Sequence, residues 1–289
     1  MSYLTVNNLT HTYGEGTPSC KVAINNISFS LEKGEVLGVI GHTGSGKSTL
    51  VTHLNGLMKP TSGSVVLDGR DIWEKPKEIK LIRSKVGLVF QYPEYQLFEE
   101  TVYKDIAFGP ANLGLTGEEL DKSVRSAARL MKVQDELLDK SPFELSGGEK
   151  RRVAIAGVLA MNPEVVVFDE PTAGLDPIGR ETIFHAIADY RAKNNATIII
   201  VSHSIEDIAA VCDKVLVLNG GEVAFFGDTR SVFSNVSGLA EIGLGVPMIT
   251  TVFEKLKSKH PDIVDSPLTV EEAYNFLSSY LSKGGNSNA

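Results

Sequence analysis

Eight residues near the start of the chain have the types and spacing of a phosphate-binding loop. Residues 41–48 read Gly-His-Thr-Gly-Ser-Gly-Lys-Ser, which matches the pattern G-x-x-x-x-G-K-[ST]. Glycines let the backbone bend so that successive N–H groups point at phosphate oxygens, and a following helix adds the partial positive charge of its N-terminus. In such a loop Lys47 reaches the β- and γ-phosphates of a nucleotide, and the Ser48 hydroxyl binds Mg²⁺.

The segments on either side favour a nucleotide site over a glycine-rich turn that carries a lysine by chance. The apolar run 36–40 predicts a buried strand before the loop, and residues 49–57 have the pattern of a helix after it. This strand–loop–helix context is what the motif requires. Tyr13 lies ahead of the loop by about two strands, in a polar glycine-rich segment. It is either an ordinary surface tyrosine or a platform for the nucleotide base.

Two adjacent carboxylates follow another apolar run, residues 165–168. At the carboxyl end of a buried strand, Asp169 can hold Mg²⁺ through water. Glu170 then lies where a carboxylate could accept a proton from an attacking water. An acidic turn at the end of a strand would have the same sequence, but the phosphate loop in the same chain favours a catalytic pair.

A second segment has the composition of an anion-binding helix N-terminus. Residues 145–149 read Leu-Ser-Gly-Gly-Glu and precede a helical pattern over 150–161. Two phosphate cradles in one chain serve either two nucleotides or one nucleotide from opposite sides. Taken alone, serine and two glycines before a helix also form a common capping turn.

Apolar runs alternate with helical patterns along the chain, which predicts βαβ units, a parallel sheet and an α/β fold. Residues 3–12 predict an edge strand, and residues 219–222 turn one strand into a hairpin at the sheet edge. Further strands are predicted at residues 24–31, 36–40, 64–67, 86–90, 165–168, 197–201, 214–218 and 223–226, and helices at 49–57, 183–193 and 205–210.

Between residues 94 and 161 helical spacing dominates, which predicts a helical insertion between two halves of the α/β core. One helical face carries Val124, Ala127, Ala128 and Met131, and a second carries Val153, Ala154, Gly157, Val158 and Met161.

The last sixty residues predict two amphipathic helices, which form either a packed tail or an interface. A small appended domain with partner contacts is favoured, followed by a disordered polar tail at 283–289. The first helix ends at His260-Pro261, and residues 269–272 fit a capping box that opens the second. The apolar faces consist of Ile249, Val252, Phe253 and Leu256 in the first helix and Ala273, Phe276, Leu277, Tyr280 and Leu281 in the second.

The composition is that of a globular protein with a large core: 289 residues, 42 % hydrophobic and 22 % charged, with a net charge of −8. An acidic total argues weakly against nucleic-acid binding, which needs a basic face. Cys20 and Cys212 lack metal-ligand spacing and are expected to be reduced thiols. No signal peptide is expected, and no apolar run approaches the ~20 residues of a membrane span, so a membrane role would be served from the water side.

Seven features in one order resemble the ATPase domains of ATP-binding-cassette (ABC) proteins, over about residues 3–230. They are Tyr13, the loop 41–48, Gln91, residues 145–149, residues 165–170, the run Ala-Gly-Leu-Asp at 173–176, and His203. The resemblance implies an α/β P-loop ATPase core with an antiparallel β subdomain, a helical insertion and a C-terminal helical domain. The division that follows is an ABC ATPase domain over 1–230, with its insertion at about 94–161, and a dimerisation region over 231–289.

The same resemblance implies roles that the spacing alone leaves open. Tyr13 stacks on adenine, Gln91 contacts Mg²⁺ and the attacking water and senses a membrane partner, and His203 contacts the γ-phosphate. Ser146 and Gly148 close over ATP bound to the opposite subunit, and Asp176 belongs to a loop between subunits. Glu149 departs from the family's usual glutamine, but a carboxylate suits a helix N-terminus.

The resemblance implies ATP and Mg²⁺ as cofactors and assigns four groups of residues. The catalytic residues are Glu170, His203, Gln91 and Lys47, and the Mg²⁺ ligands are Ser48, Gln91 and Asp169. ATP binding falls to Tyr13, Gly41, His42, Thr43, Gly44, Ser45, Gly46, Lys47, Ser48 and Thr49. Contact with the ATP of the opposite subunit falls to Ser146, Gly147, Gly148, Glu149 and Asp176.

Residues 90–102 and 105–110 narrow the resemblance to the ATPases of energy-coupling factor (ECF) transporters, and to the second of their two paralogues. This implies a peripheral protein at the cytoplasmic face of the cell membrane that energises import of vitamins or transition-metal ions. The implied partners are a first-type ATPase paralogue in a heterodimer (or a second copy in a homodimer), a transmembrane T component and a substrate-binding S component. No nucleic acid is expected.

A partner surface is predicted beside Gln91, where Tyr92, Tyr95, Leu97 and Phe98 either receive an amphipathic helix of the membrane partner or pack inside the insertion. Two other functions fit the phosphate motifs. One is a soluble ABC ATPase acting on nucleic acid or ribosomes, against which stand the acidic charge and the absence of long heptad arms. The other is a non-hydrolysing nucleotide scaffold, against which stand Lys47, Asp169 and Glu170.

Overall fold

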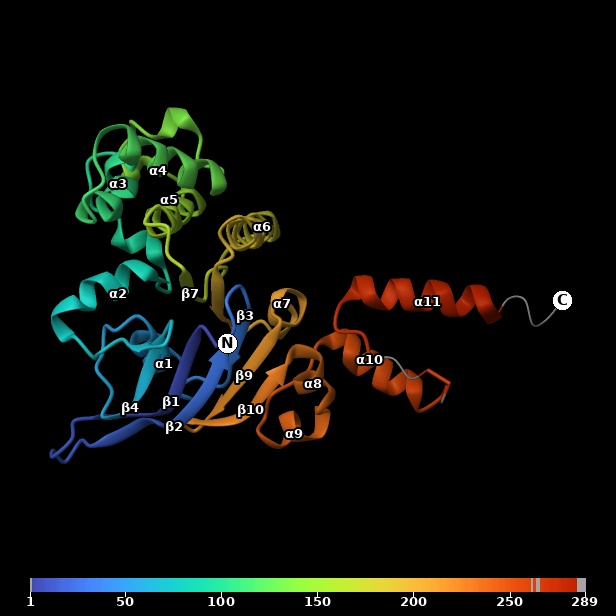
Figure 1. The fold of residues 1–289 in the computed structure, drawn as a ribbon. Helices are drawn as coiled ribbons and strands as arrows, with labels where there is room; N and C mark the ends of the chain where they lie inside the picture. Colours follow the sequence, from blue (N-terminus) through green and yellow to red (C-terminus); the bar gives the residue numbers. More distant parts are fainter. Residues whose placement is uncertain (1, 261, 264–265, 285–289) are drawn as a thin grey trace.

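The computed structural model describes residues 2–260, 262–263 and 266–284. Figure 1 shows two sheets in the lower part of the molecule, a group of helices above them, and two C-terminal helices that extend to one side. The strands are β1 (Leu4–Tyr13), β2 (Lys21–Leu31), β3 (Val36–Ile40), β4 (Ser62–Leu67), β5 (Arg70–Asp71), β6 (Val86–Val89), β7 (Val165–Asp169), β8 (Thr197–Val201), β9 (Lys214–Asn219) and β10 (Glu222–Asp228).

The α-helices of the core and insertion are α1 (Lys47–Leu54), α2 (Ile79–Lys85), α3 (Val102–Asn112), α4 (Gly117–Leu130), α5 (Gly147–Leu159), α6 (Pro177–Asn194) and α7 (Ile205–Val211). Those near the C-terminus are α8 (Thr229–Ser234), α9 (Val236–Glu241), α10 (Met248–Lys257) and α11 (Val270–Gly284). Short 3₁₀ turns lie at Pro76–Glu78, Pro93–Gln96, Asp135–Leu137 and Pro142–Glu144.

The larger sheet has the strand order β10-β9-β3-β8-β7-β6, and all its neighbouring strands are parallel except the edge strand β10. Every residue of β3 and β8 is buried, as expected for parallel strands covered on both faces. The carboxyl ends of β3, β6, β7 and β8 lead into the phosphate loop, Gln91, Glu170 and His203. Parallel pairing therefore places these four sequence features along one edge of the sheet.

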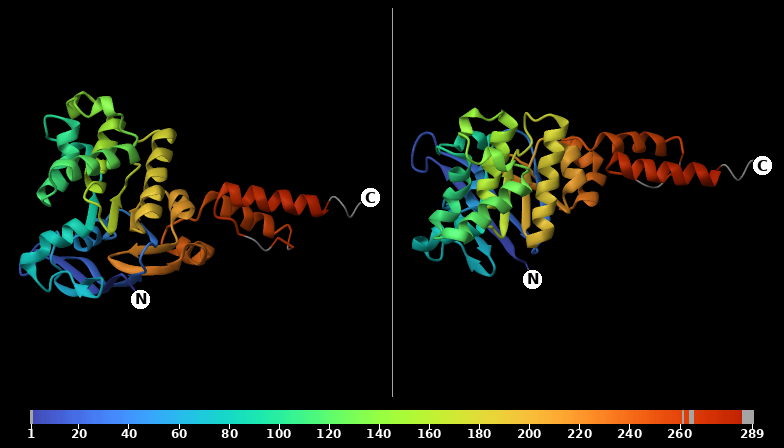
Figure 2. Two further views of the ribbon diagram at one scale, coloured as in Figure 1. Left: turned by 45° about the horizontal axis from the view of Figure 1, so that its top comes forward. Right: turned by 90° about the horizontal axis from the view of Figure 1, so that it is seen from above.

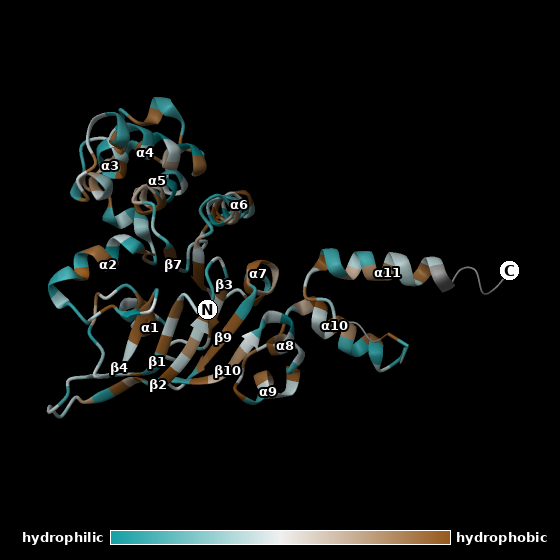
Figure 3. Ribbon diagram, in the orientation of Figure 1, coloured by the Kyte–Doolittle hydropathy of each residue, from teal (hydrophilic) through white to brown (hydrophobic). Residues whose placement is uncertain are grey.

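Alternation along each strand divides the interior into two cores, one on each face of the large sheet. In β3, Val36 and Ile40 face the core shared with α3–α7, whereas Leu37 and Val39 face the core shared with α1 and the smaller sheet. The strands β7 and β8 alternate in the same way. Figure 3 shows the resulting concentration of hydrophobic residues along β9 and its neighbours.

The smaller sheet is antiparallel, with the order β2-β1-β4-β5. The prediction that residues 3–12 form an edge strand is wrong, because β1 pairs with β2 on one side and β4 on the other. Strand order depends on contacts between segments far apart in the chain, which alternation within one segment cannot reveal. Tyr13 is the last residue of β1 rather than part of the following loop.

The helical insertion packs around α5. The predicted face of α4 is correct, since Val124, Ala127, Ala128 and Met131 are buried. For α5 the predicted face is wrong apart from Val153: the other buried apolar residues of that helix are Ile155, Ala156 and Leu159, and Ala154, Gly157 and Val158 are only half-buried. The helix is enclosed by α3, α4 and β6. It therefore has no single polar face from which its buried face could be predicted.

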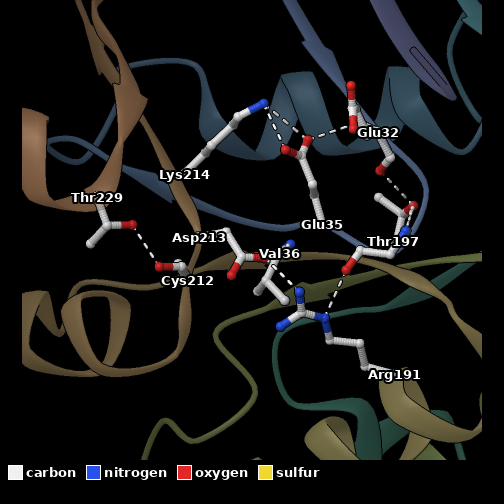
Figure 4. Close-up of polar contacts among 10 residues, drawn as sticks. Glu32, Glu35, Val36, Arg191, Thr197, Cys212, Asp213, Lys214 and Thr229 are labelled. Atoms are coloured by element: carbon white, nitrogen blue, oxygen red, sulfur yellow. Dashed lines mark hydrogen bonds and ion pairs between the residues drawn. The ribbon is translucent and has the colours of Figure 1, made fainter. Parts of the chain in front are cut away.

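A network of polar contacts lies at the other end of the large sheet, where β3 and β9 begin, away from the phosphate loop (Figure 4). An Asp213 carboxylate oxygen accepts from the Val36 amide at 2.8 Å and from Arg191 at 2.7 Å. Arg191 also donates to the Gly34 carbonyl at 2.7 Å, and Lys214 pairs with Glu35 at 2.8 Å. These contacts tie the end of α6 to the starts of β3 and β9, and so fix the strands that carry the site at their other ends.

The C-terminal helices α10 and α11 pack against each other beside the core (Figure 2). Phe253, Ile263 and Ala273 are buried between them, whereas Val252 and Leu281 are exposed, contrary to the predicted faces. In the predicted capping box, Thr269 Oγ1 accepts from the Glu272 amide at 3.1 Å, but the Glu272 carboxylate accepts from the Leu268 amide instead of closing the box.

The predicted tail is shorter than expected at its start, because α11 continues through Gly284; residues 285–289 and Pro261 lie outside the described residues. Among the residues described, no helix has the length and apolar character needed to cross a membrane.

Candidate active site

The backbone of the phosphate loop is shaped by glycines that leave no room for a side chain. Gly41 has φ +150°, and a Cβ there would lie 2.3 Å from the Leu218 carbonyl oxygen. Gly46 has φ +103°, and its Cβ would lie 2.6 Å from Ile24 Cγ2. The loop therefore packs between the end of β9 and the first half of β2, and its amides are directed by backbone geometry that L side chains rarely adopt.

Lys47 lies at the centre of this loop and is buried. Its ammonium donates to the carbonyl oxygens of Gly41 at 2.6 Å and His42 at 3.0 Å. An ammonium has three N–H groups, so one remains for a phosphate oxygen beyond these two bonds within the described residues. Burial lowers the pKa of Lys47, while the nearby Glu170 and Asp169 carboxylates oppose that shift.

A cavity of about 420 Å³ brings most of the predicted residues together. It is lined by Tyr13, Thr43, Gly44, Gly46, Lys47, Ser48, Thr49, Gln91, Asp169, Glu170 and His203 of the predicted set, and also by Lys21 and Ala23. Three predicted ATP-binding residues, Gly41, His42 and Ser45, form the loop without lining the cavity. Lys21 and Ala23 were missed because nothing in the sequence of β2 indicates that it reaches over the phosphate loop.

Tyr13 lies at the mouth of this cavity with its ring half exposed. Its hydroxyl is 3.3 Å from Thr49 Oγ1 and 3.6 Å from Met58 Sδ, which holds the side chain against α1. The His11 ring packs edge-on against it, with centroids 4.6 Å apart. A tyrosine fixed on one side and open on the other can stack on a planar base.

The two carboxylates stand at the end of β7. Glu170 has φ +51°, and its amide donates to the Val201 carbonyl at 2.9 Å, which anchors this unusual conformation to β8. His203 Nε2 lies 3.4 Å from Glu170 Oε1 without hydrogen-bond geometry, so this buried oxygen has no hydrogen-bond partner in the described part of the chain. Burial raises the pKa of Asp169 and of Glu170, and Lys47 and His203 oppose both shifts.

The oxygen donors in the cavity fit Mg²⁺. Ser48, Gln91 and Asp169 supply a hydroxyl, an amide oxygen and a carboxylate, which are the ligand types that this hard cation prefers. Asp169 is a carboxylate whose burial disfavours its charge, and a bound cation would stabilise it. These residues are few, in keeping with a metal held largely by the phosphates of a nucleotide.

A second cavity, of about 490 Å³, lies at the N-termini of α5 and α6. It is lined by Ser146, Gly148, Arg152, Gly174, Leu175, Asp176, Ile178, Gly179, Thr182 and Ile183. Residues 146–148 and 174–176 are thus brought together although the sequence separates them. Among the described residues, none lines both this cavity and the one at the phosphate loop. The chain therefore carries two separate cavities, one at the phosphate loop and one at the starts of α5 and α6.

Ser146 and Glu149 close a complete capping box at the start of α5. The Glu149 carboxylate accepts from the Ser146 amide at 2.8 Å and from its hydroxyl at 2.6 Å, and these bonds lower the pKa of Glu149. Gly147 and Glu149, both predicted to contact a nucleotide, do not line the second cavity. In this structure the Glu149 side chain serves the helix start.

One residue that sequence reasoning missed is Arg151, a buried arginine on α5. It makes a bidentate ion pair with Glu94, at 3.0 and 2.9 Å, and also donates to the Ala173 carbonyl. Its guanidinium lies 5.7 Å from the centroid of the Tyr92 ring. Arg151 thereby joins the segment after Gln91, the helix after Ser146 and the loop after Glu170.

Arg180 makes a similar link between two elements of the site. From α6 it donates to the Asp207 carboxylate at 3.0 Å and to Ser204 Oγ at 2.7 Å. Ser204 follows His203 and caps α7, and Asp176 caps α6 by accepting from the Gly179 amide at 2.6 Å. The helix that begins at Asp176 is therefore tied to the turn that holds His203. The sequence gives no signal for this pair, because its partners are 27 residues apart.

Comparison with known proteins identifies the family. The family model described as "ABC transporter" matches residues 24–173. A relative from Acetivibrio thermocellus, named energy-coupling factor transporter ATP-binding protein EcfA2, is 53 % identical over 279 residues, which cover 96 % of this chain and 98 % of the relative. The chain belongs to the ABC transporter family, among its energy-coupling factor ATP-binding proteins.

Two solved structures of ATP-binding cassettes are similar in fold to this chain. CbiO1 from Clostridium perfringens, described as part of the ABC transporter complex cbiONQ, aligns with a TM-score of 0.74 and 37 % identity, over 91 % of this chain and 97 % of that one. A dimer of the ATP-binding cassette MJ0796 in a post-hydrolysis state with ADP and Pi aligns with a TM-score of 0.71 and 29 % identity, over 78 % of this chain and 99 % of that one. The predicted family and fold class are thus confirmed.

Proposed function

We propose that this energy-coupling factor ATPase hydrolyses ATP at a seam between two cassettes, and that closure of the seam drives a membrane partner. The observation that supports this mechanism is the separation of the two cavities. The phosphate loop and the Ser146 helix start occupy different places on one chain, so neither alone surrounds a triphosphate. A second cassette, facing the first, would complete both sites. The solved structure of the MJ0796 cassette is described as dimeric and bound to ADP and Pi.

In the proposed site the residues of the first cavity bind ATP. Tyr13 stacks on the adenine, the loop amides cradle the phosphates, and Lys47 contacts the β- and γ-phosphates through its remaining N–H. Ser48, Gln91 and Asp169 would hold Mg²⁺, which would supply positive charge to neutralise the phosphates. Ser146, Gly148 and Asp176 of the facing cassette cover the same nucleotide from the other side.

Hydrolysis is assigned to the residues at the ends of β7 and β8. Glu170 Oε1, which is buried and without a hydrogen-bond partner among the residues described, accepts a proton from water. The water oxygen attacks the γ-phosphorus, and the bond to the β–γ bridging oxygen breaks to give ADP and phosphate. His203 holds the γ-phosphate, and Gln91 orients the water. The raised pKa of Glu170 makes it a stronger base than an exposed glutamate.

The exposed aromatic surface beside Gln91 is the proposed docking site for a helix of the transmembrane T component. Tyr92, Tyr95, Phe98 and Phe108 are exposed there, and Phe98 and Phe108 pack edge-on with centroids 4.9 Å apart. Leu97, which the sequence suggested for this surface, is buried in the insertion. Because Arg151 joins Tyr92 and Glu94 to α5, a helix bound here would feel movement of the Ser146 helix start.

The C-terminal region, 231–289, is proposed to strengthen pairing of the two ATPases. Val270, Tyr274 and Leu281 are exposed and fall on one side of α11, beside the face that packs against α10. The proposed partner is the first-type paralogue, with a homodimer where that paralogue is absent. The proposed cargo, a vitamin or a transition-metal ion, would be bound by the S component. The relatives do not favour an ATPase acting on nucleic acid, and neither does the net charge of −8.

Isolation of the tagged chain from detergent-solubilised membranes tests this function. We expect the first-type paralogue, a T component and an S component in the preparation, and a much higher ATPase rate per cassette than in the isolated chain. Ser146→Arg should block closure and lower turnover while ATP still binds the phosphate loop of the same chain. Recovery of the chain as a fully active monomer, or with nucleic acid in place of membrane subunits, would overturn the proposal.

A further inference from the structure

The segment that leads from the core to the C-terminal helices lies against the phosphate loop. Leu239 is fully buried, and Ile242, Leu244 and Val246 pack on the main core. The segment 239–246 ends two residues before α10 begins at Met248. One end of the segment therefore leads directly into α10, and its middle lies beside the phosphate loop.

A histidine of the phosphate loop makes the direct contact. His42 Nε2 lies 2.8 Å from the Ile242 carbonyl oxygen, so this nitrogen carries a proton and donates. Gly243 fits against the same ring: it has φ +74°, and a Cβ there would lie 3.1 Å from His42 Nε2. The His42 carbonyl in turn accepts from Lys47 at 3.0 Å. A single residue thus touches the segment with its side chain and the catalytic lysine with its backbone.

The segment also reaches the turn that holds His203. A Cβ at Gly245 would lie 3.8 Å from Ile205 Cδ1, and Ile205 opens α7 two residues after His203. The same stretch of chain therefore contacts the phosphate loop at His42 and lies beside the start of α7, two residues after His203. A shift of the segment would be felt at both.

We propose that residues 239–246 form a coupling segment that transmits the position of α10 and α11 to the ATP site, with His42 as the positioning residue. Displacement of α10 pulls on Ile242 and Gly243, which move the His42 ring and, through its carbonyl, the Lys47 ammonium. Pairing of the C-terminal helices would then change the affinity of the phosphate loop for ATP. This inference rests on the proposed function and adds regulation to it.

A double-mutant cycle between His42 and Gly243 tests the contact in the purified transporter complex. His42→Ala should weaken binding of a fluorescent ATP analogue by roughly 3- to 10-fold, the loss of one hydrogen bond, and His42→Gln should restore most of it. Gly243→Ala should weaken binding similarly, and the double variant should be no worse than either single variant, because both act at one contact.

Gly114→Ala is the matched control, since Gly114 also has positive φ (+92°) and, apart from its chain neighbours, no heavy atom of the described residues lies within 4 Å of its Cβ position. It should bind the analogue normally. If the losses for His42→Ala and Gly243→Ala were additive, or if Gly114→Ala lost as much affinity, the contact between His42 and Gly243 would not control ATP binding.

Transmission is tested by a second cycle with Tyr274→Glu on the exposed side of α11. We expect this change to alter ATP affinity at least 3-fold in the parent chain and not at all in His42→Ala. An equal effect in both backgrounds, or no effect in the parent, overturns the coupling segment. In either case normal ATPase activity of the parent complex leaves the proposed function standing, whereas an inactive parent complex would refute that function itself.

Discussion

At the scale of single residues, Glu170 combines two unfavourable conditions. Its backbone is in the left-handed region, φ +51°, which costs a non-glycine residue free energy, and its carboxylate is buried. Asparagine or glycine would adopt this backbone more easily. Burial raises the pKa of Glu170, and a carboxylate with a raised pKa suits the proposed role of a base beside a phosphate.

Glu170→Gln should retain ATP binding and lose turnover by about 10²- to 10⁴-fold, the usual contribution of a general base. The amide has almost the same shape but cannot accept the proton. Steady-state phosphate release and ATP-analogue binding, measured on the same complex, check this. Glu181→Gln, at an exposed glutamate of α6, is the control and should turn over normally. Normal hydrolysis by Glu170→Gln would remove Glu170 from catalysis.

The same substitution should stabilise the fold at alkaline pH. Burial raises the folded-state pKa of Glu170 above its ordinary value of 4.5, so the charged carboxylate destabilises the folded state when the pH lies above both values. That penalty disappears as the pH falls through the folded pKa. The melting temperature of Glu170→Gln should therefore exceed that of the parent at pH 8, and the difference should shrink as the pH approaches 5. A difference that is constant with pH would contradict this assignment.

Several of these residues could be predicted from the sequence because short-range order fixes their geometry. The phosphate loop needs only its own eight residues and the two elements beside it, so Lys47 and Ser48 could be placed directly. Asp169 and Glu170 follow from the end of one apolar run. Arg151 and Lys21 could not be found in this way, because each acquires its role from a segment more than 20 residues distant.

At the scale of elements, two arginines, the buried Arg151 and the partly exposed Arg180, connect parts of the site that the chain keeps apart. Arg151 ties α5 to the segment after β6 and the loop after β7, and Arg180 ties α6 to the start of α7. The strands could be predicted because burial on two faces leaves long apolar runs. The order of the small sheet and the orientation of α5 could not, since β1 is flanked by distant strands and α5 is enclosed on several sides.

Arg151→Met should destabilise the protein by about 3 kcal/mol or more, because it leaves the Glu94 carboxylate largely buried without its partner. Adding Glu94→Gln should recover part of the loss. Urea denaturation of the single and double variants gives the coupling between the two residues.

The control is Arg125→Met, which removes an ion pair of the same kind with Asp121. Both side chains of that pair are about 40 % exposed (39 % and 44 %), compared with 3 % and 16 % for Arg151 and Glu94. The loss for Arg125→Met should be below about 1 kcal/mol. Equal losses for the two arginines would mean that burial of the Arg151 pair does not matter.

At the scale of the whole molecule, the C-terminal helices project from the cassette (Figure 1). Val270, Tyr274 and Leu281 give α11 an exposed hydrophobic side. The amphipathic pattern of the C-terminal segment predicted two packed helices. It could not show that Val252 and Leu281 stay exposed, because the period of a helix fixes which residues share a face but not how wide the buried part is.

Val270→Glu combined with Tyr274→Glu should weaken association of the ATPase pair in the absence of ATP, since it places two charges on that exposed side of α11. Sedimentation velocity at several concentrations measures the change, expected to be at least 10-fold in the dissociation constant. Ser279→Glu, exposed and about 140° around the helix from Tyr274, should have no effect. Unchanged association of the double variant would show that this side of α11 does not pair the cassettes.

In the proposed pair of cassettes, the separation of the two cavities also determines how damaged cassettes would complement each other. If Lys47 is lost from one cassette and Ser146 from its neighbour, both lesions fall on the same ATP, and the other ATP keeps an intact set of residues. If one cassette carries both lesions, each ATP loses one side of its site. Two defects shared between neighbours should therefore spare more transport than the same two defects inherited on a single gene.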